Sequence, residues 1–450
     1  MRAVLTRLFI LTTAMFFALP AVSQTRDIEN ILTQREQAEL YNKNLESKLD
    51  NVLPEIMRRE NLEMWIVICF EYHEDPVYRT LTTWPLDNAR RLSIVMFHDS
   101  PDGFKKLSAT WHGARASGYM YEGIFTDQSK GPEGQFEAVA DYIREADPES
   151  IGINYDSESL DDFSHANGLS HFHYEKLYEA LGEKYRNRLV SAKDVVIGWF
   201  ETRTPWEVSF YRHLAGIAHD LIEEYYSNAV ITPDVTTTDD VRWWIAERIK
   251  ELKLDYWFFP TFRIIRSPEN IEKYGRDDNV IRRGDLLHSD VGISYMGLTT
   301  DMQHSGYVLR EDETDAPEGL KKLFEKGKRM QDIIFEEMVE GRTGNEILAS
   351  VLERGEEEGL NPIMYSHPIN YYGHGSGMTI GRTDRQEFVE GTGEHPLYNN
   401  TTYAMEFSVA ASVPEWNNET VRLGFEENII FRNGRARFID GRQEELYLIR

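Results

Sequence analysis

The spacing of apolar side chains predicts alternating helices and strands in the first half of the chain. Residues 25–60 are rich in Glu, Lys, Arg and Leu at helical spacing, which predicts a helix. Short apolar runs predict buried strands at 65–70, 92–97 and 151–155. Helical spacing predicts a helix around 137–146, before the third strand. Strands that alternate with helices are typical of an α/β fold, and we assign residues 24–198 to a smaller N-terminal α/β domain.

The pattern changes after residue 200. Pro205, followed by Trp206 and Glu207, is typical of a helix start. Two long helices are predicted, over 205–229 and 237–253, and the rest of the chain is strand-like and rich in Gly, Asp and His. We assign residues 199–450 to a second domain.

The first 23 residues have the pattern of a signal peptide. Arg2 and Arg7 flank the start of an apolar run from Leu8 to Leu19, and the small residues 21–23 form a cleavage site. We therefore expect export to the periplasm or the medium. The run is too short to span a membrane, so no stable membrane insertion is expected. An uncleaved membrane anchor is the alternative.

Composition limits the possible partners. Of 450 residues, 41% are hydrophobic, which is enough for two cores, and the formal net charge is −27. Such a chain repels phosphate backbones, so no nucleic-acid partner is expected. The single cysteine, Cys69, lies in a strand-like run and excludes an intramolecular disulfide.

Two aspartates and one histidine stand in positions that suit a metal site. Asp290 and Asp301 are eleven residues apart, so two strands joined by a short turn bring their carboxylates side by side. His374 lies in Gly-His-Gly-Ser-Gly at 373–377, where glycines allow close backbone approach and expose the imidazole. A flexible loop is the simpler reading of this segment. A P-loop is excluded because no Lys-Ser/Thr follows.

Two later strands carry acidic residues among apolar ones. Glu406 lies in one, and Glu426 with Glu427 in the other. A buried carboxylate is costly unless it is paired or metal-bound, although an edge strand with an exposed face also accommodates one. Strand alternation does not choose between Glu426 and Glu427. The ordered set Asp, Asp, His, Glu, Glu suits a pair of divalent ions such as Mn, Zn, Co or Fe.

These motifs resemble those of the pita-bread metallopeptidases, the creatinase, aminopeptidase P and prolidase family. The resemblance covers roughly residues 200–450, and the N-terminal domain more weakly. It implies an α+β fold in which a curved antiparallel sheet flanked by helices follows a smaller α/β domain. It also implies two divalent metal ions, most often Mn, in the concave face of the sheet, and a homodimer.

The resemblance also implies a role for each motif residue. Glu406 is the implied general base, and the family's preferred bond often precedes proline. The implied metal ligands are Asp290 for one ion, His374 and Glu406 for the other, and Asp301 and Glu426 as bridges. Glu426 is chosen because the family has an acid or Asn directly after this ligand, and Glu427 occupies that place.

The sequence departs from the family at three places. A non-ligand histidine is expected at position 273, where the chain has Lys273, and another seven residues after the ligand histidine, where counting from His374 reaches Gly381. Lys273 can donate to an oxyanion in place of the first, although a surface lysine is an equally good reading. The arginine often found two residues before the last glutamate is Gly424.

Three further histidines flank the motifs. His288 lies two residues before Asp290, so strand alternation predicts one face for both, although a core histidine explains it as well. His367, seven residues before His374, is expected to line the site. His304, three residues after Asp301, is predicted to face away.

The sequence thus predicts an exported dinuclear-metal hydrolase. The most specific prediction is an Xaa-Pro aminopeptidase or dipeptidase that acts on a small peptide or amide. The catalytic residues we name are Glu406, Lys273, His288 and His367. The alternatives are a hydrolase or lyase that acts on a non-peptide small molecule, or a metal-binding homologue without catalysis.

Overall fold

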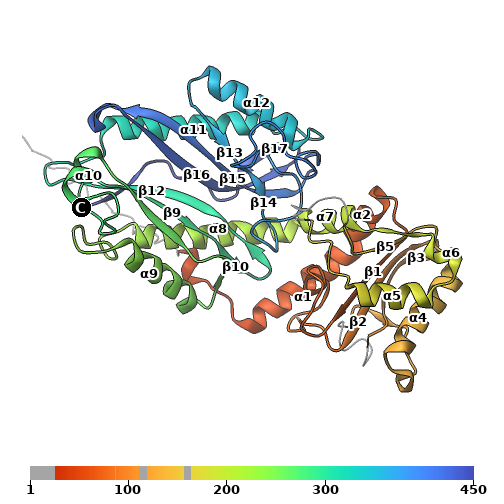
Figure 1. Cartoon of the computed structure of the whole chain (residues 1–450). Coiled ribbons are helices and arrows are strands. Elements are labelled where there is room, and N and C mark those ends of the chain that lie inside the picture. Colours follow the sequence, from red (N-terminus) through yellow and green to blue (C-terminus); the bar gives the residue numbers. More distant parts are fainter. Residues whose placement is uncertain (1–25, 87, 111–118, 157–163) are drawn as a thin grey trace, which may run out of the picture.

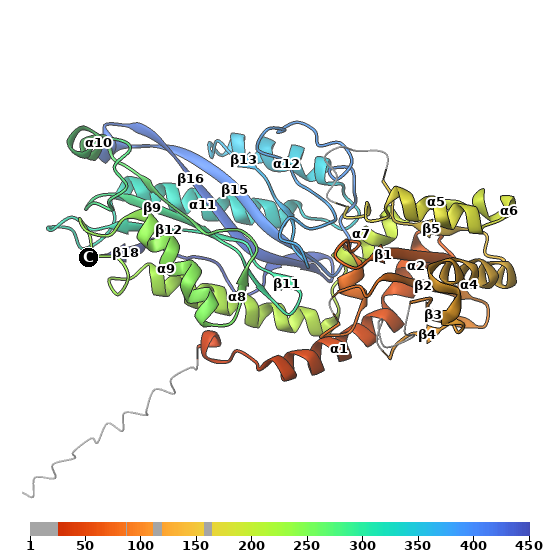
Figure 2. The ribbon, with the colours of Figure 1, turned by 60° about the horizontal axis from the view of Figure 1, so that its bottom comes forward.

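The structure is a computed structural model that describes residues 26–86, 88–110, 119–156 and 164–450. The predicted signal peptide, residues 1–23, lies outside the described residues. Figures 1 and 2 show two domains placed end to end, each built around its own sheet, with α1 (Gln34–Asn51) and α7 (Lys193–Glu201) near their junction.

The N-terminal domain contains a six-stranded mixed sheet with helices on both faces. Alternate residues of the central strand β1 (Met64–Phe70) face two separate hydrophobic cores, one on each face of the sheet. Trp65 belongs to one core and Ile66 to the other. The strand order is β4-β3-β2-β1-β5-β6. The strands are β1 (Met64–Phe70), β2 (Leu92–Ser100), β3 (Gly103–Ser108), β4 (Glu122–Gly123), β5 (Ile151–Ile153) and β6 (Leu189–Ser191), and the other helices are α2 (Leu53–Arg59), α4 (Gly131–Ala146), α5 (His171–Ala180) and α6 (Glu183–Arg186).

The C-terminal domain begins at a capped helix. Thr204 and Glu207 form a capping box at the start of α8 (Pro205–Tyr225), and Pro205 occupies the first turn. This confirms the helix start predicted from the sequence. The other helices of this domain are α9 (Thr238–Glu251), α10 (Pro268–Tyr274), α11 (Glu318–Glu337) and α12 (Gly344–Glu357). Across the whole described chain, short 3-10 helices lie at Asp27–Glu29, Tyr78–Leu81, Gln128–Lys130 and Pro414–Trp416.

A nine-stranded sheet forms the centre of this domain, and all of its pairings are antiparallel except that of β18 with β12. Its main strand order is β13-β15-β16-β12-β9-β8. The strands are β8 (Thr261–Ile265), β9 (Leu286–Val291), β12 (Met302–Val308), β13 (Ile363–Met364), β14 (His367–Pro368), β15 (Thr401–Val413), β16 (Glu419–Arg432), β17 (Arg435–Phe438) and β18 (Tyr447–Ile449). A small second sheet contains β7 (Asp255–Tyr256), β10 (Ile293–Tyr295) and β11 (Leu298–Thr299).

Helices cover one face of the large sheet and leave the other for the site. On the covered face, Ser289 shares a hydrogen bond with Tyr225 of α8, and Phe425 packs against Gly327 of α11. Because side chains alternate along a strand, Asp290 and Glu426 point to the opposite face. The predicted α+β architecture, with a curved antiparallel sheet flanked by helices, is confirmed.

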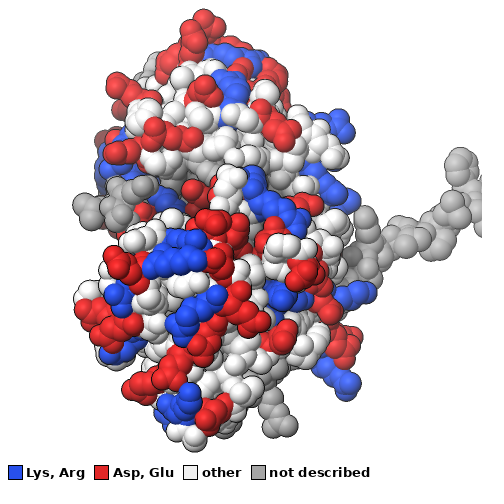
Figure 3. All heavy atoms as spheres, turned by 90° about the vertical axis from the view of Figure 1, so that its right-hand side faces the viewer, with Lys and Arg blue, Asp and Glu red and all other residues white. Residues whose placement is uncertain are grey.

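Charges of both signs are interspersed on the end of the molecule formed by the N-terminal domain. Figure 3 shows Asp and Glu beside Lys and Arg across this face, with no continuous basic surface. Within the described ranges, every helix is too short or too polar to cross a membrane.

Candidate metal centre

The register of four adjacent strands aligns the polar residues of the site in one row. Asp290 of β9 pairs with Gln303 of β12, and Gln303 pairs with Glu426 of β16. Glu426 in turn pairs with Glu406 of β15. Asp301 directly precedes β12. The row therefore brings residues more than a hundred positions apart in sequence to one place on the uncovered face.

Asp290 and Asp301 belong to the two arms of one long hairpin. β9 pairs with β12 and β10 with β11, and the chain reverses at Met296 and Gly297, which both have positive φ. Two such residues are typical of a tight hairpin turn. The prediction that a turn brings the two aspartates together is confirmed, because ligand oxygens of Asp290, Asp301 and Glu426 lie within 4.8 Å of one another.

Burial leaves several atoms of this cluster without hydrogen bonds. Asp301 and Glu426 are 4% and 1% exposed. Within the described part of the chain, no hydrogen bond reaches Asp290 Oδ1, Asp301 Oδ1, Glu426 Oε1 or His367 Nε2. Buried polar atoms rarely lack hydrogen-bond partners, so four of them in one cluster fit a site that binds a metal ion or another polar ligand.

The pKa values of the four acidic side chains in the cluster are all raised. Burial raises the pKa of Glu406 to about 8, with a further contribution from the charge of Glu426. Burial, and then the charge of neighbouring carboxylates, also raises the pKa values of Asp301 and Glu426. Burial alone raises the pKa of Asp290. Bound cations would reverse this effect, because a positive charge favours the ionised form. The donor set of carboxylates and imidazole fits divalent metal ions.

Gln303 links two of the predicted ligands and was not predicted as a site residue. Its amide nitrogen donates hydrogen bonds to Glu406 Oε1 at 2.8 Å and Glu426 Oε2 at 2.9 Å. This fixes one oxygen of each carboxylate and leaves the other available. The signal was present in the sequence, because Gln303 lies two residues after Asp301 at the start of a strand.

Two histidines approach the carboxylates from different depths. His367 is 3% exposed, and its Nε2 lies 3.6 Å from both Asp301 Oδ2 and Glu426 Oε1. His374 is exposed, and its ring centroid lies 4.7 Å from that of His367. His374 also comes within reach of Asp301. The buried position inside the cluster therefore belongs to His367, and His374 lies at its entrance.

The remaining predicted residues lie in different surroundings. His288 is buried on the face of Asp290, and burial lowers its pKa to about 3, so that it stays neutral. The structure does not bring Lys273 to the cluster. Lys273 is exposed near the end of α10, with its ammonium 4.8 Å from the centre of the Tyr274 ring.

A pocket of about 360 Å³ opens beside the row of carboxylates. Two arginines that the sequence did not single out stand at its wall. Arg422 donates to Ser408 Oγ at 3.1 Å, and Arg263 is exposed on β8. Residues from five strands and two loop residues line the pocket, among them Arg263, Gln303, Tyr365, Glu406, Arg422 and Gly424.

The N-terminal domain holds the loop that carries His374. Tyr372 donates a hydrogen bond to the carbonyl of Pro76 at 2.9 Å, and Ser376 donates one to the carbonyl of Ser164 at 2.8 Å. His165 lies 3.3 Å from the carbonyl oxygen of His374 itself. The small domain therefore fixes one wall of the site.

A family comparison agrees with this geometry. The profile of metallopeptidase family M24 matches residues 210–438, about half of the chain. The chain belongs to metallopeptidase family M24. The matched region of this M24 chain starts in α8 and ends with β17, so it contains the whole row of site residues. No curated protein matches the sequence.

Solved structures share the fold of this M24 chain over nearly its full length. An X-Pro aminopeptidase from Thermotoga maritima MSB8 has 12% identity and a TM-score of 0.60, covering 88% of this chain and 99% of its own. An Xaa-Pro dipeptidase from Bacillus anthracis has 15% identity and a TM-score of 0.58, covering 92% and 100%. A prolidase from Pyrococcus furiosus has 12% identity and a TM-score of 0.55, covering 87% and 100%. At such identities the likeness shows the fold alone, the pita-bread fold with its N-terminal domain.

Proposed function

We propose that this M24 chain is an exported dinuclear-metal hydrolase that cleaves Xaa-Pro bonds in short peptides. The observation that carries the proposal is the convergence of five ligand-type side chains, four of which have buried atoms that receive no hydrogen bond from the residues the structure describes. Export is supported by the signal-like residues 1–23, and the preference for proline by the resemblance to peptidases of this type. A homodimer is proposed on the same resemblance.

The proposed metal ligands come from the row and from β14. Two divalent ions, Mn before Zn, Co or Fe, would supply Lewis acidity and lower the pKa of a water molecule. Gln303 would keep Glu406 and Glu426 oriented through its two hydrogen bonds. The residues proposed to hold the ions are Asp290, Asp301, His367, Glu406 and Glu426.

Glu406 is proposed to accept the proton of the attacking water. It is only half-buried and lines the pocket beside the row, so substrate and solvent reach it. A carboxylate in this position can take a proton and pass it to the leaving amine. His288 and Lys273, which we named from the sequence, are less suitable: the first is a neutral buried imidazole and the second lies outside the cluster.

The two histidines are proposed to exchange the roles that the sequence motif suggested. With His367 as the metal ligand, the family's second histidine is expected seven residues later, and that position is His374. The histidine that seemed to be absent at Gly381 is then present. Although His374 is exposed, partial desolvation of its ring and then the charge of His367 lower its pKa to about 4, so a neutral imidazole stands at the entrance to donate to or accept from the substrate.

The pocket is proposed to bind the carboxylate of a short substrate. Arg263 and Arg422 are the cationic groups at its wall, and guanidinium groups pair well with carboxylates. Gly424 contributes space here, where the family often has an arginine. The same pocket suits a small non-peptide amide that carries a carboxylate, which is the second candidate substrate class.

A substrate panel tests the proposal. The purified chain without residues 1–23 is incubated with Mn²⁺ and with Xaa-Pro dipeptides, Xaa-Pro tripeptides, matched Xaa-Ala peptides and N-acyl amino acids. We expect hydrolysis of the Xaa-Pro series that chelation abolishes and that Asp290→Ala lowers by at least about 10³-fold. Hydrolysis of N-acyl amino acids alone would favour the second class. No metal-dependent hydrolysis in any series would contradict the proposal.

A further inference from the structure

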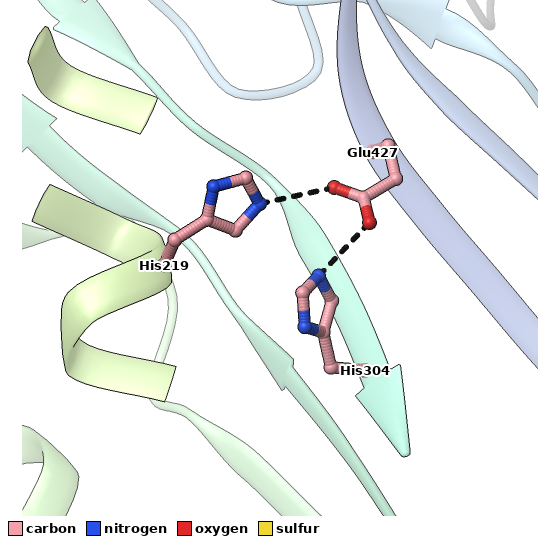
Figure 4. A group of neighbouring side chains, drawn as sticks. All are labelled: His219, His304 and Glu427. Atoms are coloured by element: carbon pink, nitrogen blue, oxygen red, sulfur yellow. Dashed lines mark hydrogen bonds and ion pairs between the residues drawn. The ribbon is translucent and has the colours of Figure 1, made fainter. Parts of the chain in front are cut away.

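A second cluster of metal-binding side chains lies behind the row, on the helix-covered face of the sheet. His219 comes from α8, His304 from β12 and Glu427 from β16 (Figure 4). Glu427 follows Glu426 directly, so the two carboxylates point to opposite faces of one strand. The prediction that His304 faces away from the site is confirmed, and its surroundings suggest a function of their own.

The three side chains converge on a single small space. His219 Nε2 lies 3.3 Å from Glu427 Oε2, and His304 Nε2 lies 3.0 Å from Glu427 Oε1. Ligand atoms of a tetrahedral Zn²⁺ ion with bonds of 2.0–2.1 Å are about 3.3 Å apart. Each imidazole nitrogen therefore already stands near ligand spacing from the carboxylate, and ligand atoms of the three residues lie within 4.8 Å of one another.

The Nδ1 atoms of His219 and His304, which point away from Glu427, have polar partners of their own. His219 Nδ1 lies 3.1 Å from Asp440 Oδ2, and His304 Nδ1 lies 3.4 Å from the hydroxyl of Tyr447. The backbone N–H of Gln443 donates to Glu427 Oε1 at 2.7 Å. Such partners orient metal-ligating histidines and fix which ring nitrogen faces the ion.

Burial distinguishes this cluster from a surface ion pair. His304 and Glu427 are 1% and 2% exposed, whereas the side chain of His219 is 18% exposed. Within the described part of the chain, no hydrogen bond of good geometry reaches His304 Nε2, despite its approach to Glu427. The buried nitrogen is held near Glu427 by charge and not by a well-formed hydrogen bond, which leaves it able to bind an ion, and His219 leaves a route from solvent.

We propose that His219, His304 and Glu427 form a third metal site, separate from the dinuclear centre, for a divalent ion of the zinc class. Two imidazoles and one carboxylate favour Zn²⁺ over the harder Mg²⁺ or Ca²⁺. The ion joins α8 to β12 and β16, the strands that carry Gln303 and Glu426. Its role is to fix these strands from behind.

Metal counting on the full chain tests this site. The chain is loaded with Zn²⁺, freed of excess ion by gel filtration and analysed for metal. We expect about one ion per chain less in His219→Gln and in His304→Gln than in the parent chain. His213→Gln is the matched control, since His213 lies on the same helix and pairs with Asp27 at 2.8 Å. Its metal content should equal that of the parent chain.

The same measurement separates this site from the dinuclear centre. Asp290→Asn should lose metal from the centre and keep the ion that His219→Gln removes. Asp440→Asn, which keeps all three ligands, should weaken Zn²⁺ binding at this site by about 10–100-fold. Circular dichroism identifies variants that fail to fold. Unchanged metal content in folded His219→Gln and His304→Gln would overturn the third site and leave a proton-bridged histidine network.

Discussion

At the scale of single residues, the main question is whether His367 or His374 binds the metal. Both lie near the carboxylates, yet one is buried among them and the other is exposed at the entrance. A buried imidazole 3.6 Å from two carboxylates is suited to hold an ion. An exposed imidazole at the entrance is suited to meet the substrate.

Substituting the two histidines separately tests this assignment. His367→Ala should reduce the metal content of the chain and abolish hydrolysis. His374→Ala should keep the metal and lower kcat by about 10²–10⁴-fold, the usual contribution of a proton-transferring side chain. Elemental analysis measures the metal content and steady-state kinetics measures kcat on the same preparations. Loss of metal in His374→Ala, with full retention in His367→Ala, would reverse the assignment.

The raised pKa of Glu406 predicts how the metal-free chain responds to pH. Its pKa is 4.5 in an ordinary setting and about 8 in the fold. The folded chain therefore retains a proton that the unfolded chain loses between these values, and the free energy of unfolding falls as pH rises from 4.5 towards 8. The expected loss from this group is on the order of a few kcal/mol.

Urea unfolding with a chelator present, at pH 5 and pH 8, measures this effect. The comparison with Glu406→Gln isolates the group from other titrating residues, because Gln carries no titratable proton. Glu406→Gln should lose less stability over this range than the parent chain. An identical pH dependence in both chains would contradict a raised pKa at Glu406.

At the scale of elements, contact between α11 and β16 leaves no room for added atoms. A Cβ placed on Gly327 would lie 2.1 Å from the ring of Phe425. Gly327→Ala should therefore lower the free energy of unfolding by about 1–3 kcal/mol, even though alanine favours helix. Gly182→Ala is the control, because nothing lies within 4 Å and its φ of −73° suits any residue. If denaturant unfolding gave the two variants the same free energy of unfolding, the close contact between Gly327 and Phe425 would be contradicted.

The sequence predicted the elements well, because their signals are local. Apolar runs located β1, β2 and β5, and Pro205 located the start of α8. Strand-like runs placed Asp290, Glu406 and Glu426 on strands, the family resemblance favoured Glu426 over Glu427, and the structure brings Asp290, Glu406 and Glu426 together.

Features set by long-range pairing were not predictable. His367 was expected to line the site, but its buried position inside the cluster depends on the pairing of β14 with β15, which no local pattern reveals. The Gly-rich motif at 373–377 drew attention to His374 instead. Lys273 was chosen by counting back from Gly284, but the end of α10 leaves it exposed and away from the cluster.

At the scale of the whole molecule, a buried ion pair connects the two domains. Lys48 of α1 lies 3.3 Å from Glu207, the residue that closes the capping box of α8. Their side chains are 7% and 8% exposed. Removing only one partner leaves an uncompensated buried charge, which costs far more than an exposed pair contributes.

This ion pair predicts a pattern of single and double variants. Lys48→Met should lower the free energy of unfolding by up to about 3 kcal/mol, since buried Glu207 then keeps only Arg203, 3.9 Å away, as a cationic partner. Lys48→Met combined with Glu207→Gln should recover part of this loss, because Gln still fills the capping box, although Arg203 then lacks the carboxylate it faces at 3.9 Å. Thermal and urea unfolding of the three chains measure the effect. A double variant no more stable than Lys48→Met would contradict the account.

Anomalous diffraction from crystals grown with Mn²⁺ tests the central claim most directly, because it locates ions independently of activity. The account predicts two anomalous peaks between Asp290, Asp301, Glu406 and Glu426, one of them beside Nε2 of His367. Crystals that contain Mn²⁺ but show no peak in this cluster would contradict it.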